Sequence, residues 1–404
     1  MIPSALLLLL PMTAAAPASK RAEPAPLIVP RDGSAVFHDQ YTVILKDDSD
    51  SQALTNVMEL IPGNATQVYG NLFKGFTAEL DEASLGALIL VTDGDQVDFV
   101  EMDQKVSLPD EPQGKADALE ADPNVTAPVV GPQSPVPSHP DQVFRRYNGL
   151  TPYLNNPTGG EGVCAYVVDS GVDVTHPEFG GRAHMVKSTV DWHGQDLVGH
   201  GTHVAGILGS NSYGVAKRVT IYGIKALSKR PDASGISTLI AGLDYVARDA
   251  PHRNCPNGIV VNVSASIAER NEALNMAVRM LAERGYFVAV AAGNEGHDAR
   301  FNSPASEPSI CTAGDYRYRD SNFGPAVDIQ APAVNVLSTV PGGRIYRLTG
   351  TSMASPYIAG SCCVHSLGPS STCRSGSLRV DGAEGYSAMV VLGAGWIVDA
   401  CNLK

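Results

Sequence analysis

The chain has 404 residues, of which 44% are hydrophobic and 18% are charged, and it contains 40 glycines. That length accommodates one large domain and a smaller one, and the apolar share supports a sizeable buried core. The net charge of −13 at pH 7 argues against nucleic acid or an anionic membrane surface as the partner.

The N-terminus has the pattern of a secretory signal. Residues 5–10 (ALLLLL) form a short apolar core, and small residues follow near Ala16 and Ala18. We therefore predict a signal peptide over 1–18 and a secreted, extracellular protein, against the alternative of a disordered Ala/Pro leader. Later apolar runs are shorter than the ~18 residues of a membrane span. Export makes disulfides permissible among the seven cysteines.

Residues 40–108 are predicted to form a small α+β domain. Alternating and helical apolar patterns indicate strands at 41–47, 73–80 and 96–108 and helices at 51–60 and 82–91. Residues 109–142 are rich in Pro, Asp, Ala and Gln without apolar periodicity, and a linker is predicted over 109–150.

From about residue 160 apolar strands alternate with helical segments. The predicted strands are 163–171, 219–227, 258–266, 286–294 and 326–332, and helices are predicted at 236–250 and 269–285. Near-continuous Val, Ile and Ala strands are buried on both faces, which predicts an α/β fold with a mainly parallel sheet between helices. In such sheets, polar residues at the carboxyl ends of the strands line the functional crevice.

Three motifs carry candidate catalytic side chains. Asp169 ends an apolar strand in VVDSG, although an Asp before Gly is also a common turn. In GHGTHVAG, His200 and His203 open a helical run; a metal pair or a helix cap are the alternatives. Ser352 in GTSMASP precedes a helix, where it is either a nucleophile or an ordinary N-cap. Pro356 is expected in the first turn of that helix.

An acid, a base and a hydroxyl thus occur in the order Asp, His, Ser. These motifs, with DSGVDVTHPEFGGRA, YGVAK and AVAAGNEGHDARFNSPASEPSICT, resemble the subtilisin-like serine protease family (peptidase S8), most closely its fungal proteinase K-like branch. The resemblance covers about 162–360, and residues 40–108 resemble its ferredoxin-like inhibitory propeptide of the I9 type. It implies a subtilisin-like protease domain over 151–404 and a maturation site within 109–150, with a tail after 368 that departs from the family pattern.

The resemblance also implies roles. Asp169 would orient the imidazole, His200 would be the general base and His203 a helix residue, and Ser352 would attack the scissile carbonyl. Asn294 in AAGN would donate its amide to the oxyanion. With an ordinary imidazole pKa of about 6.5, activity would be lost below about pH 6 as His200 protonates.

Two segments correspond to the substrate-binding strands of the family. Ser234 and Gly235, with Ala233, match an edge that adds a substrate strand. On the other side the family has Ser-Leu-Gly-Gly, whereas this chain has Ser264, Ala265, Ser266 and Ile267. Side chains at the glycine positions are expected to narrow or block the primary specificity pocket.

By resemblance, Cys164 pairs with Cys255 and Cys311 pairs with Cys373, whereas Cys362, Cys363 and Cys401 have no obvious partners. A structural Ca²⁺ site carries over onto the carbonyls of Pro308 and Ile310 and the carboxylate of Asp328, and oxygen ligands suit that ion. The alternative for Asp328 is a turn at a strand end. No cofactor is expected for the chemistry.

We therefore expect a secreted, monomeric serine endopeptidase that hydrolyses polypeptides through Asp169, His200 and Ser352 and is made as a precursor inhibited by its own propeptide. The alternative is a catalytically impaired or non-catalytic relative, suggested by the altered substrate strand and by the tail after 368. A different serine hydrolase such as an esterase is disfavoured, because the chain lacks a Gly-x-Ser-x-Gly elbow at Ser352.

Overall fold

The computed structural model describes residues 24–31, 35–49, 52–61, 63–90, 96–106, 159–191, 193–230, 233–316, 318–364 and 388–389. The predicted signal peptide, the linker over 109–150 and most of the tail after 368 lie outside the described residues.

The small domain is a five-stranded sheet with two helices. Its elements are β1 (Leu27–Ile28), β2 (Val36–Leu45), α1 (Ala53–Met58), β3 (Gln67–Tyr69), β4 (Gly75–Glu79), α2 (Glu82–Leu90) and β5 (Val97–Gln104). The strand order β1-β5-β2-β4-β3, with β2 antiparallel to both β4 and β5, contains the βαββαβ arrangement of ferredoxin-like domains. Val43, Phe76 and Val100 lie in its core. Sequence patterns predicted α1, α2 and three of these strands; the short β1 and β3 were not predicted.

The large domain is built on an eight-stranded sheet in which every pairing is parallel. Its strands are β6 (Cys164–Asp169), β7 (Ala183–Ser188), β8 (Thr220–Lys225), β9 (Ile259–Val263), β10 (Phe287–Ala291), β11 (Cys311–Gly314), β12 (Ile329–Gln330) and β15 (Ala388–Met389). They are ordered β15-β12-β11-β10-β9-β6-β8-β7. The predicted parallel α/β sheet is therefore confirmed.

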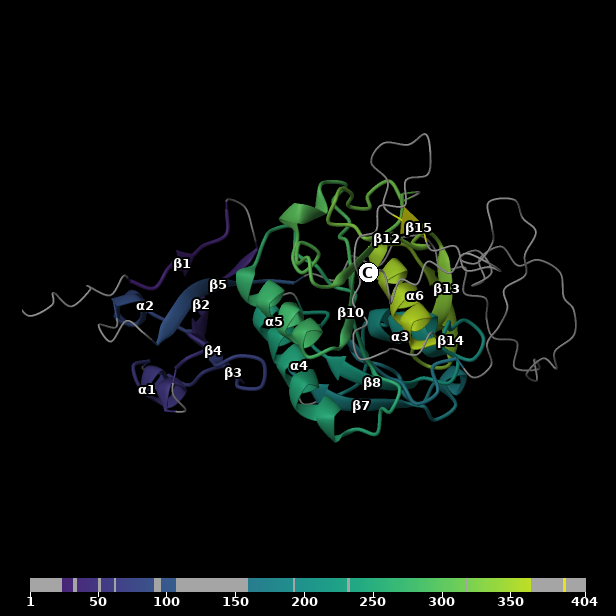
Figure 1. Cartoon of the computed structure of the whole chain (residues 1–404), viewed down its shortest axis with the longest axis horizontal. Helices are drawn as coiled ribbons and strands as arrows, with labels where there is room; N and C mark the ends of the chain where they lie inside the picture. The colour runs from purple at the N-terminus through teal and green to yellow at the C-terminus, as the bar shows by residue number, and fades with distance from the viewer. Residues whose placement is uncertain are drawn as a thin grey trace, which may run out of the picture.

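Helices cover both faces of this sheet (Figure 1). α3 (His200–Gly209) and α6 (Thr351–Val364) pack on one face, and α4 (Ile236–Asp249) and α5 (Glu272–Glu283) pack on the other. Successive residues of β6 point to opposite faces, so Val167 joins the core with α3 and α6, whereas Val168 joins the core with α4 and α5. The strand is buried on both sides, which explains its continuous apolar run.

A hairpin of β13 (Val336–Val340) and β14 (Arg344–Leu348) lies over α3. Short 3₁₀ turns occur at η2 (Pro177–Phe179), η3 (Ala250–His252) and η4 (Ala299–Phe301). Within the described residues no helix is long and apolar enough to cross a membrane.

The small domain lies against α4 and α5, as Figure 1 shows in purple and blue beside teal and green. Two of its carboxylates accept hydrogen bonds from the first turns of these helices. Glu101 accepts from the backbone N–H groups of Glu272 (3.0 Å) and Ala273 (2.9 Å). Asp103 accepts from the backbone N–H of Ser237 at 3.0 Å. These carboxylates complement the unpaired N–H groups and the positive end of each helix dipole.

Candidate active site

Asp169 and His200 lie together at the carboxyl end of β6. Asp169 is the last residue of β6, and His200 is the first residue of α3, after Gly199 in the left-handed conformation (φ 95°). His200 Nδ1 is 2.8 Å from Asp169 Oδ1, and both side chains are buried. Because a carboxylate only accepts, Nδ1 carries the proton and Nε2 keeps a lone pair. That Nε2 atom has no hydrogen-bond partner among the described residues.

The close approach of α3 to β6 depends on Gly201. A Cβ atom at this position would lie 2.1 Å from the carbonyl oxygen of Gly171 and 3.1 Å from the Cβ of Asp169. The glycine between the two histidines therefore lets the helix touch the strand that carries Asp169.

We expect Gly201→Ala to separate α3 from β6 and to break the Asp169–His200 contact, because backbone atoms cannot move aside as a side-chain tip can. Overpacking of this kind costs about 1–3 kcal/mol of stability, and hydrolytic activity should be lost. Thermal unfolding and peptide hydrolysis measure both effects. Gly194→Ala is the control, because its Cβ would meet nothing closer than 3.7 Å. Unchanged turnover in Gly201→Ala would contradict this interpretation.

His203 lies one turn further along α3 and faces away from Asp169. Its Nε2 is 3.0 Å from the carbonyl oxygens of both Val336 and Tyr346, to which it donates. Burial lowers the pKa of His203 to about 3, so the ring is neutral at physiological pH. No group of three or more His, Cys, Asp or Glu side chains in the described part of the chain could hold a metal ion.

Ser352 is the second residue of α6 and is 3% exposed. Its hydroxyl donates to the carbonyl oxygen of Ser264 (3.0 Å) rather than to His200. Pro356 stands at the sixth position of α6, so its expected place in the first turn was wrong. Because proline has no N–H, the carbonyl of Ser352 lacks its usual helical donor four residues on. The hydroxyl of Ser264 donates to that carbonyl instead, at 2.8 Å.

Asn294 follows β10 and is held against the start of α6. Its Oδ1 accepts from the backbone N–H (2.8 Å) and the hydroxyl (2.9 Å) of Thr351. With Oδ1 occupied in this way, the Nδ2 group is left available to donate. Thr351 was not identified from the sequence, although it lies in the GTSMASP motif.

The edge formed by Ser234 and Gly235 is covered by the end of the small domain. The backbone N–H of Val106 donates to the carbonyl of Ser234 (3.0 Å), and Lys105 forms an antiparallel bridge with Gly235. The Val106 side chain is buried in the core cluster that contains α4 and α5. The residues that follow β5 therefore pair with this edge through one antiparallel bridge and one backbone hydrogen bond.

The second predicted substrate-binding segment, residues 264–267, packs inward. Ala265 and Ile267 are 6% and 8% exposed and belong to the core cluster on the α4 and α5 side, whereas Ser266 is half-buried. The backbone of Ile267 pairs with Ser303 in both directions, at 2.9 and 3.2 Å. Ile267 thus fixes the end of this segment to a neighbouring loop.

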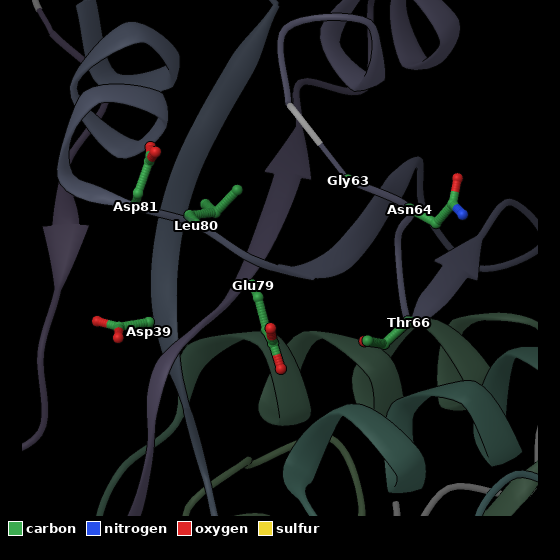
Figure 2. A pocket seen from close by; sticks show the side chains of 7 residues that line it. All are labelled: Asp39, Gly63, Asn64, Thr66, Glu79, Leu80 and Asp81. Carbon is green, nitrogen blue, oxygen red and sulfur yellow. The ribbon is translucent and has the colours of Figure 1, made fainter.

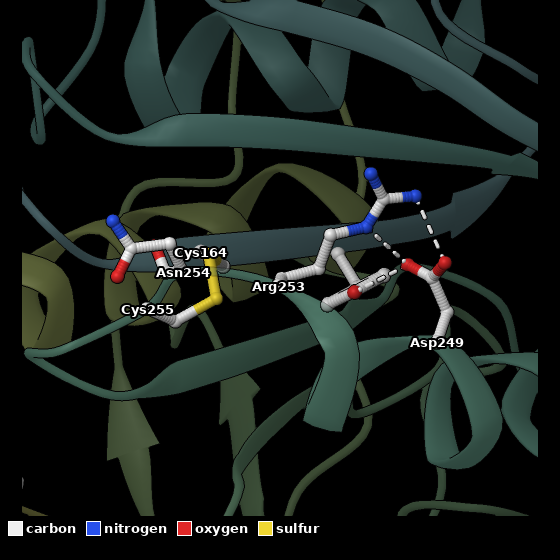
Figure 3. Close-up of a disulfide and its surroundings, with 6 residues drawn as sticks. Cys164, Asp249, Arg253, Asn254 and Cys255 are labelled. Carbon is white, nitrogen blue, oxygen red and sulfur yellow. Dashed lines mark hydrogen bonds and ion pairs between the residues drawn. A yellow bond between two sulfur atoms is a disulfide. The ribbon is translucent and has the colours of Figure 1, made fainter.

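The cysteines fall into three groups. Cys164 and Cys255 form a disulfide with a Cα–Cα distance of 5.5 Å, between the start of β6 and the loop after η3, beside the Arg253–Asp249 ion pair (Figure 3). Cys311 and Cys362 are also disulfide-bonded, so the expectation that Cys362 has no partner was wrong. Cys363 is free and buried. Cys373 and Cys401 lie outside the described residues.

Asp328 lies just before β12 and is mostly buried. Its Oδ2 accepts from the backbone N–H of Thr312 at 2.8 Å. Burial raises the pKa of Asp328 to about 6, and that hydrogen bond only partly opposes it. No cationic side chain of the described residues pairs with this carboxylate. Pro308 and Ile310 lie immediately before β11, the strand that pairs with β12.

A pocket of about 560 Å³ lies on the small domain and contains none of the predicted site residues. Figure 2 shows its lining, which is Asp39, Gly63, Asn64, Thr66, Glu79, Leu80 and Asp81. Asp81 is committed to capping α2, because its Oδ1 accepts from the backbone N–H of Ser84 at 2.8 Å. The pocket is therefore a feature of the small domain and is separate from the Asp169–His200 pair.

Comparison with known proteins identifies the family. The model of the Subtilase family (peptidase S8) matches residues 160–366. The chain is 40% identical over 364 residues to a cuticle-degrading protease of Metarhizium anisopliae, a match that covers 88% of this chain and 87% of that protein. It is 41% identical over 366 residues to proteinase R of Parengyodontium album, with coverage of 88% and 87%. The crystal structure of a cold adapted subtilisin-like serine proteinase aligns with a TM-score of 0.52 and 36% identity, over 57% of this chain and 86% of that chain.

A parallel sheet between helices, with Asp169 and His200 at its carboxyl end, defines an α/β protein with the subtilisin-like fold. The chain belongs to the subtilase family of serine proteases, and its relatives include proteinase K-like fungal enzymes.

Proposed function

We propose that this protein is a secreted serine endopeptidase in which Asp169, His200 and Ser352 form the catalytic triad. The observation that carries the proposal is the buried hydrogen bond from His200 Nδ1 to Asp169 Oδ1 (2.8 Å), which leaves Nε2 as an acceptor without a partner in the described part of the chain. Because the chain belongs to a family of serine proteases, we propose that its substrates are polypeptides.

In the proposed reaction the Ser352 hydroxyl turns from the Ser264 carbonyl towards His200 Nε2. As Ser352 Oγ bonds to the scissile carbonyl carbon, its proton passes to Nε2, and Asp169 stabilises the resulting imidazolium. His200 then gives the proton to the leaving amine, and water releases the acyl group by the same route. The backbone N–H of Ser352 and Nδ2 of Asn294 would hold the oxyanion; one such side-chain donor contributes about 3–4 kcal/mol to transition-state stabilisation.

We also propose that the small domain is an inhibitory propeptide. The strand that ends in Lys105 and Val106 occupies the Ser234–Gly235 edge, where a polypeptide substrate would add its own strand. Cleavage after the described end of this strand, within the linker, would convert the inhibited precursor into a monomeric enzyme. Secretion is supported by the N-terminal apolar segment and by the Cys164–Cys255 disulfide.

The test is to express the full chain and Ser352→Ala in a secreting host and to treat both with a fluorophosphonate. We expect the covalent label on Ser352, self-processing in the unmodified chain only, and hydrolysis of a peptide substrate after processing. A folded chain that is neither labelled nor processed, beside a reactive relative, would favour a non-catalytic protein. That alternative is not favoured by the comparisons, because the named relatives are proteases.

A structural Ca²⁺ ion is proposed at Asp328 with the carbonyls of Pro308 and Ile310. The donor set fits, because oxygen ligands suit Ca²⁺ and this mostly buried carboxylate has no cationic partner in the part of the chain that the structure describes. The ion would stabilise the fold and would take no part in the chemistry.

Chelation is therefore expected to lower the melting temperature by about 5–10 °C, if the ion is supplied at about a hundred times its Kd. Asp328→Asn should remove most of the difference in melting temperature between samples with chelator and samples with added Ca²⁺. Asp298 pairs with Arg300 on the surface, so Asp298→Asn should keep that difference. Differential scanning calorimetry gives the comparison. Equal melting temperatures with and without chelator would exclude the site.

A further inference from the structure

Asp196, in the loop that leads into α3, is a buried carboxylate with no part in the proposed reaction. It is 7% exposed and accepts five hydrogen bonds. Its Oδ1 accepts from the Ser170 hydroxyl (2.9 Å) and from the backbone N–H groups of Val198 (3.1 Å) and Gly199 (2.8 Å). Its Oδ2 accepts from the backbone N–H (2.9 Å) and the hydroxyl (2.6 Å) of Thr202.

These contacts reach both halves of the Asp169–His200 pair. Ser170 follows Asp169, and its backbone N–H donates to Asp169 Oδ1 at 2.7 Å, the same oxygen that His200 contacts. The Ser170 hydroxyl also accepts from the backbone N–H of Gly201 at 2.9 Å. Asp196 thus connects the residue after the acid with residues on either side of the base.

The need for such a connection lies in the way α3 begins. Gly199 at the N-cap position has no side chain to accept from the first-turn N–H groups. His200 itself is the first helical residue, so any fraying of this turn would displace the imidazole. Asp196 supplies the missing acceptor from outside the helix and ties the turn to the end of β6.

The charge of Asp196 acts on the same ring. Burial opposes protonation of His200, but the charge and hydrogen bond of Asp169 outweigh it, and the charge of Asp196 adds to them, so that the pKa of His200 is raised. The neighbouring ring of His203, on the same helix, is neutral. The titratable groups that interact with the charge of His200 are Asp169, Asp196 and His203.

We propose that Asp196 is a positioning residue, which holds Asp169 and His200 in the geometry for proton transfer through Ser170 and Thr202. The proposal rests on the proposed serine protease function. It assigns Asp196 no contact with the substrate or with Ser352.

The test compares Asp196→Asn with Asp173→Asn in the full chain, after processing. Asp173 is the matched control, because its carboxylate accepts from Thr175 and Gly342 and not from the connecting residues. Its backbone N–H donates to the Thr202 hydroxyl, and Asp173→Asn leaves that N–H in place. For Asp196→Asn we expect kcat per titrated active site to fall about 10–100-fold, with KM little changed. The acid limb of the kcat/KM profile should move to lower pH. Asp173→Asn should retain the unmodified values.

Ser170, whose hydroxyl donates to Asp196, provides a second test. This test remains available if Asp196→Asn does not fold. Ser170→Ala should lower kcat in the same direction, and Ser170→Thr, which keeps a hydroxyl, should restore it. A lower melting temperature with unchanged kcat and an unchanged acid limb in these variants would overturn the proposal, since a merely structural role predicts that result.

The two proposals can fail separately. If the unmodified chain neither hydrolyses peptides nor takes up a fluorophosphonate, the serine protease function fails and the assignment of Asp196 fails with it. If the unmodified chain is active and the Asp196 and Ser170 variants match it, only the role of Asp196 is refuted.

Discussion

Asp169→Asn is expected to lower kcat by about 10⁴-fold while leaving the protein folded. Asparagine has nearly the same shape, but its amide can present a donor to Nδ1, which would place the imidazole proton on Nε2 and remove the acceptor that Ser352 needs. Hydrolysis of a chromogenic peptide, after limited digestion with an unrelated protease that is then inhibited, measures the loss. Circular dichroism confirms the fold, and Asp173→Asn is the control.

The same variant should change the pH dependence. In the unmodified enzyme burial disfavours the charged ring, but Asp169 outweighs this and raises the pKa of His200. With His200 as the proposed general base, activity requires the neutral ring, so it should fall as the pH drops through a value above the ordinary 6.5. This moves the expected limit upwards from the pH 6 that an unperturbed histidine suggested. In Asp169→Asn the charge that opposes the effect of burial on the pKa of His200 is gone. That pKa should fall, and the acid limb of the activity profile should move to lower pH. An acid limb at the same pH in both proteins would contradict this assignment.

Removal of the small domain's Glu101 carboxylate is expected to weaken its attachment to α5. Glu101→Ala deletes both acceptors of the Glu272 and Ala273 N–H groups, a loss of about 2–3 kcal/mol, or roughly a hundredfold in local hydrogen exchange. Exchange at these two amides, measured in the Ser352→Ala chain so that no processing occurs, gives the result. Asp98→Ala, an exposed carboxylate on the same strand, is the control. Unchanged exchange in Glu101→Ala would show that the carboxylate does not cap α5.

This contact should also depend on pH. Burial raises the pKa of Glu101 to about 7 in the docked domain, in spite of the two N–H donors. Because the docked pKa lies above that of a free glutamate, about 4.3, docking is strongest below pH 4.3 and weakens as the pH rises through about 7. Glu101→Gln, which does not titrate, should reduce this dependence, and the part that remains should come from Asp103, whose pKa burial also raises. A flat profile in the unmodified chain would refute the prediction.

The sequence predicted those parts of the fold whose residues are uniformly apolar or strictly alternating. β6, β8, β9 and β10 were identified because both of their faces are buried. β12 lies inside the strand predicted at 326–332, although it is shorter than that prediction. β7 (AHMVKS) was not identified, because it has mixed polarity at the edge of the sheet, and β11 was not identified because its four residues are too few for a pattern. Propensity and periodicity alone do not specify such elements.

The candidate site was predicted where a residue lies inside a motif. Asp169, His200, Ser352 and Asn294 were all named from quoted motifs, and the structure places Asp169 against His200. Asp196 was not named, because one aspartate in a polar loop has no distinguishing pattern. Its five hydrogen bonds come from groups as far away as Ser170, and only the folded chain brings them together. For the same reason the sequence did not reveal that Glu101 and Asp103 cap α5 and α4. In the sequence they are only polar positions of an ordinary strand.

The attachment of the small domain through the first turns of α4 and α5 has a consequence for the lifetime of the processed chain that we propose. The sheet beneath these helices joins strands distant in the chain, such as β6 with β8 and β9, and such long-range pairing folds slowly. If the small domain is removed as proposed, a chain that then unfolds has lost the partner that holds those helices at their starts. The lifetime of such a processed chain should therefore be set by the height of the barrier to unfolding, rather than by the equilibrium between folded and unfolded states.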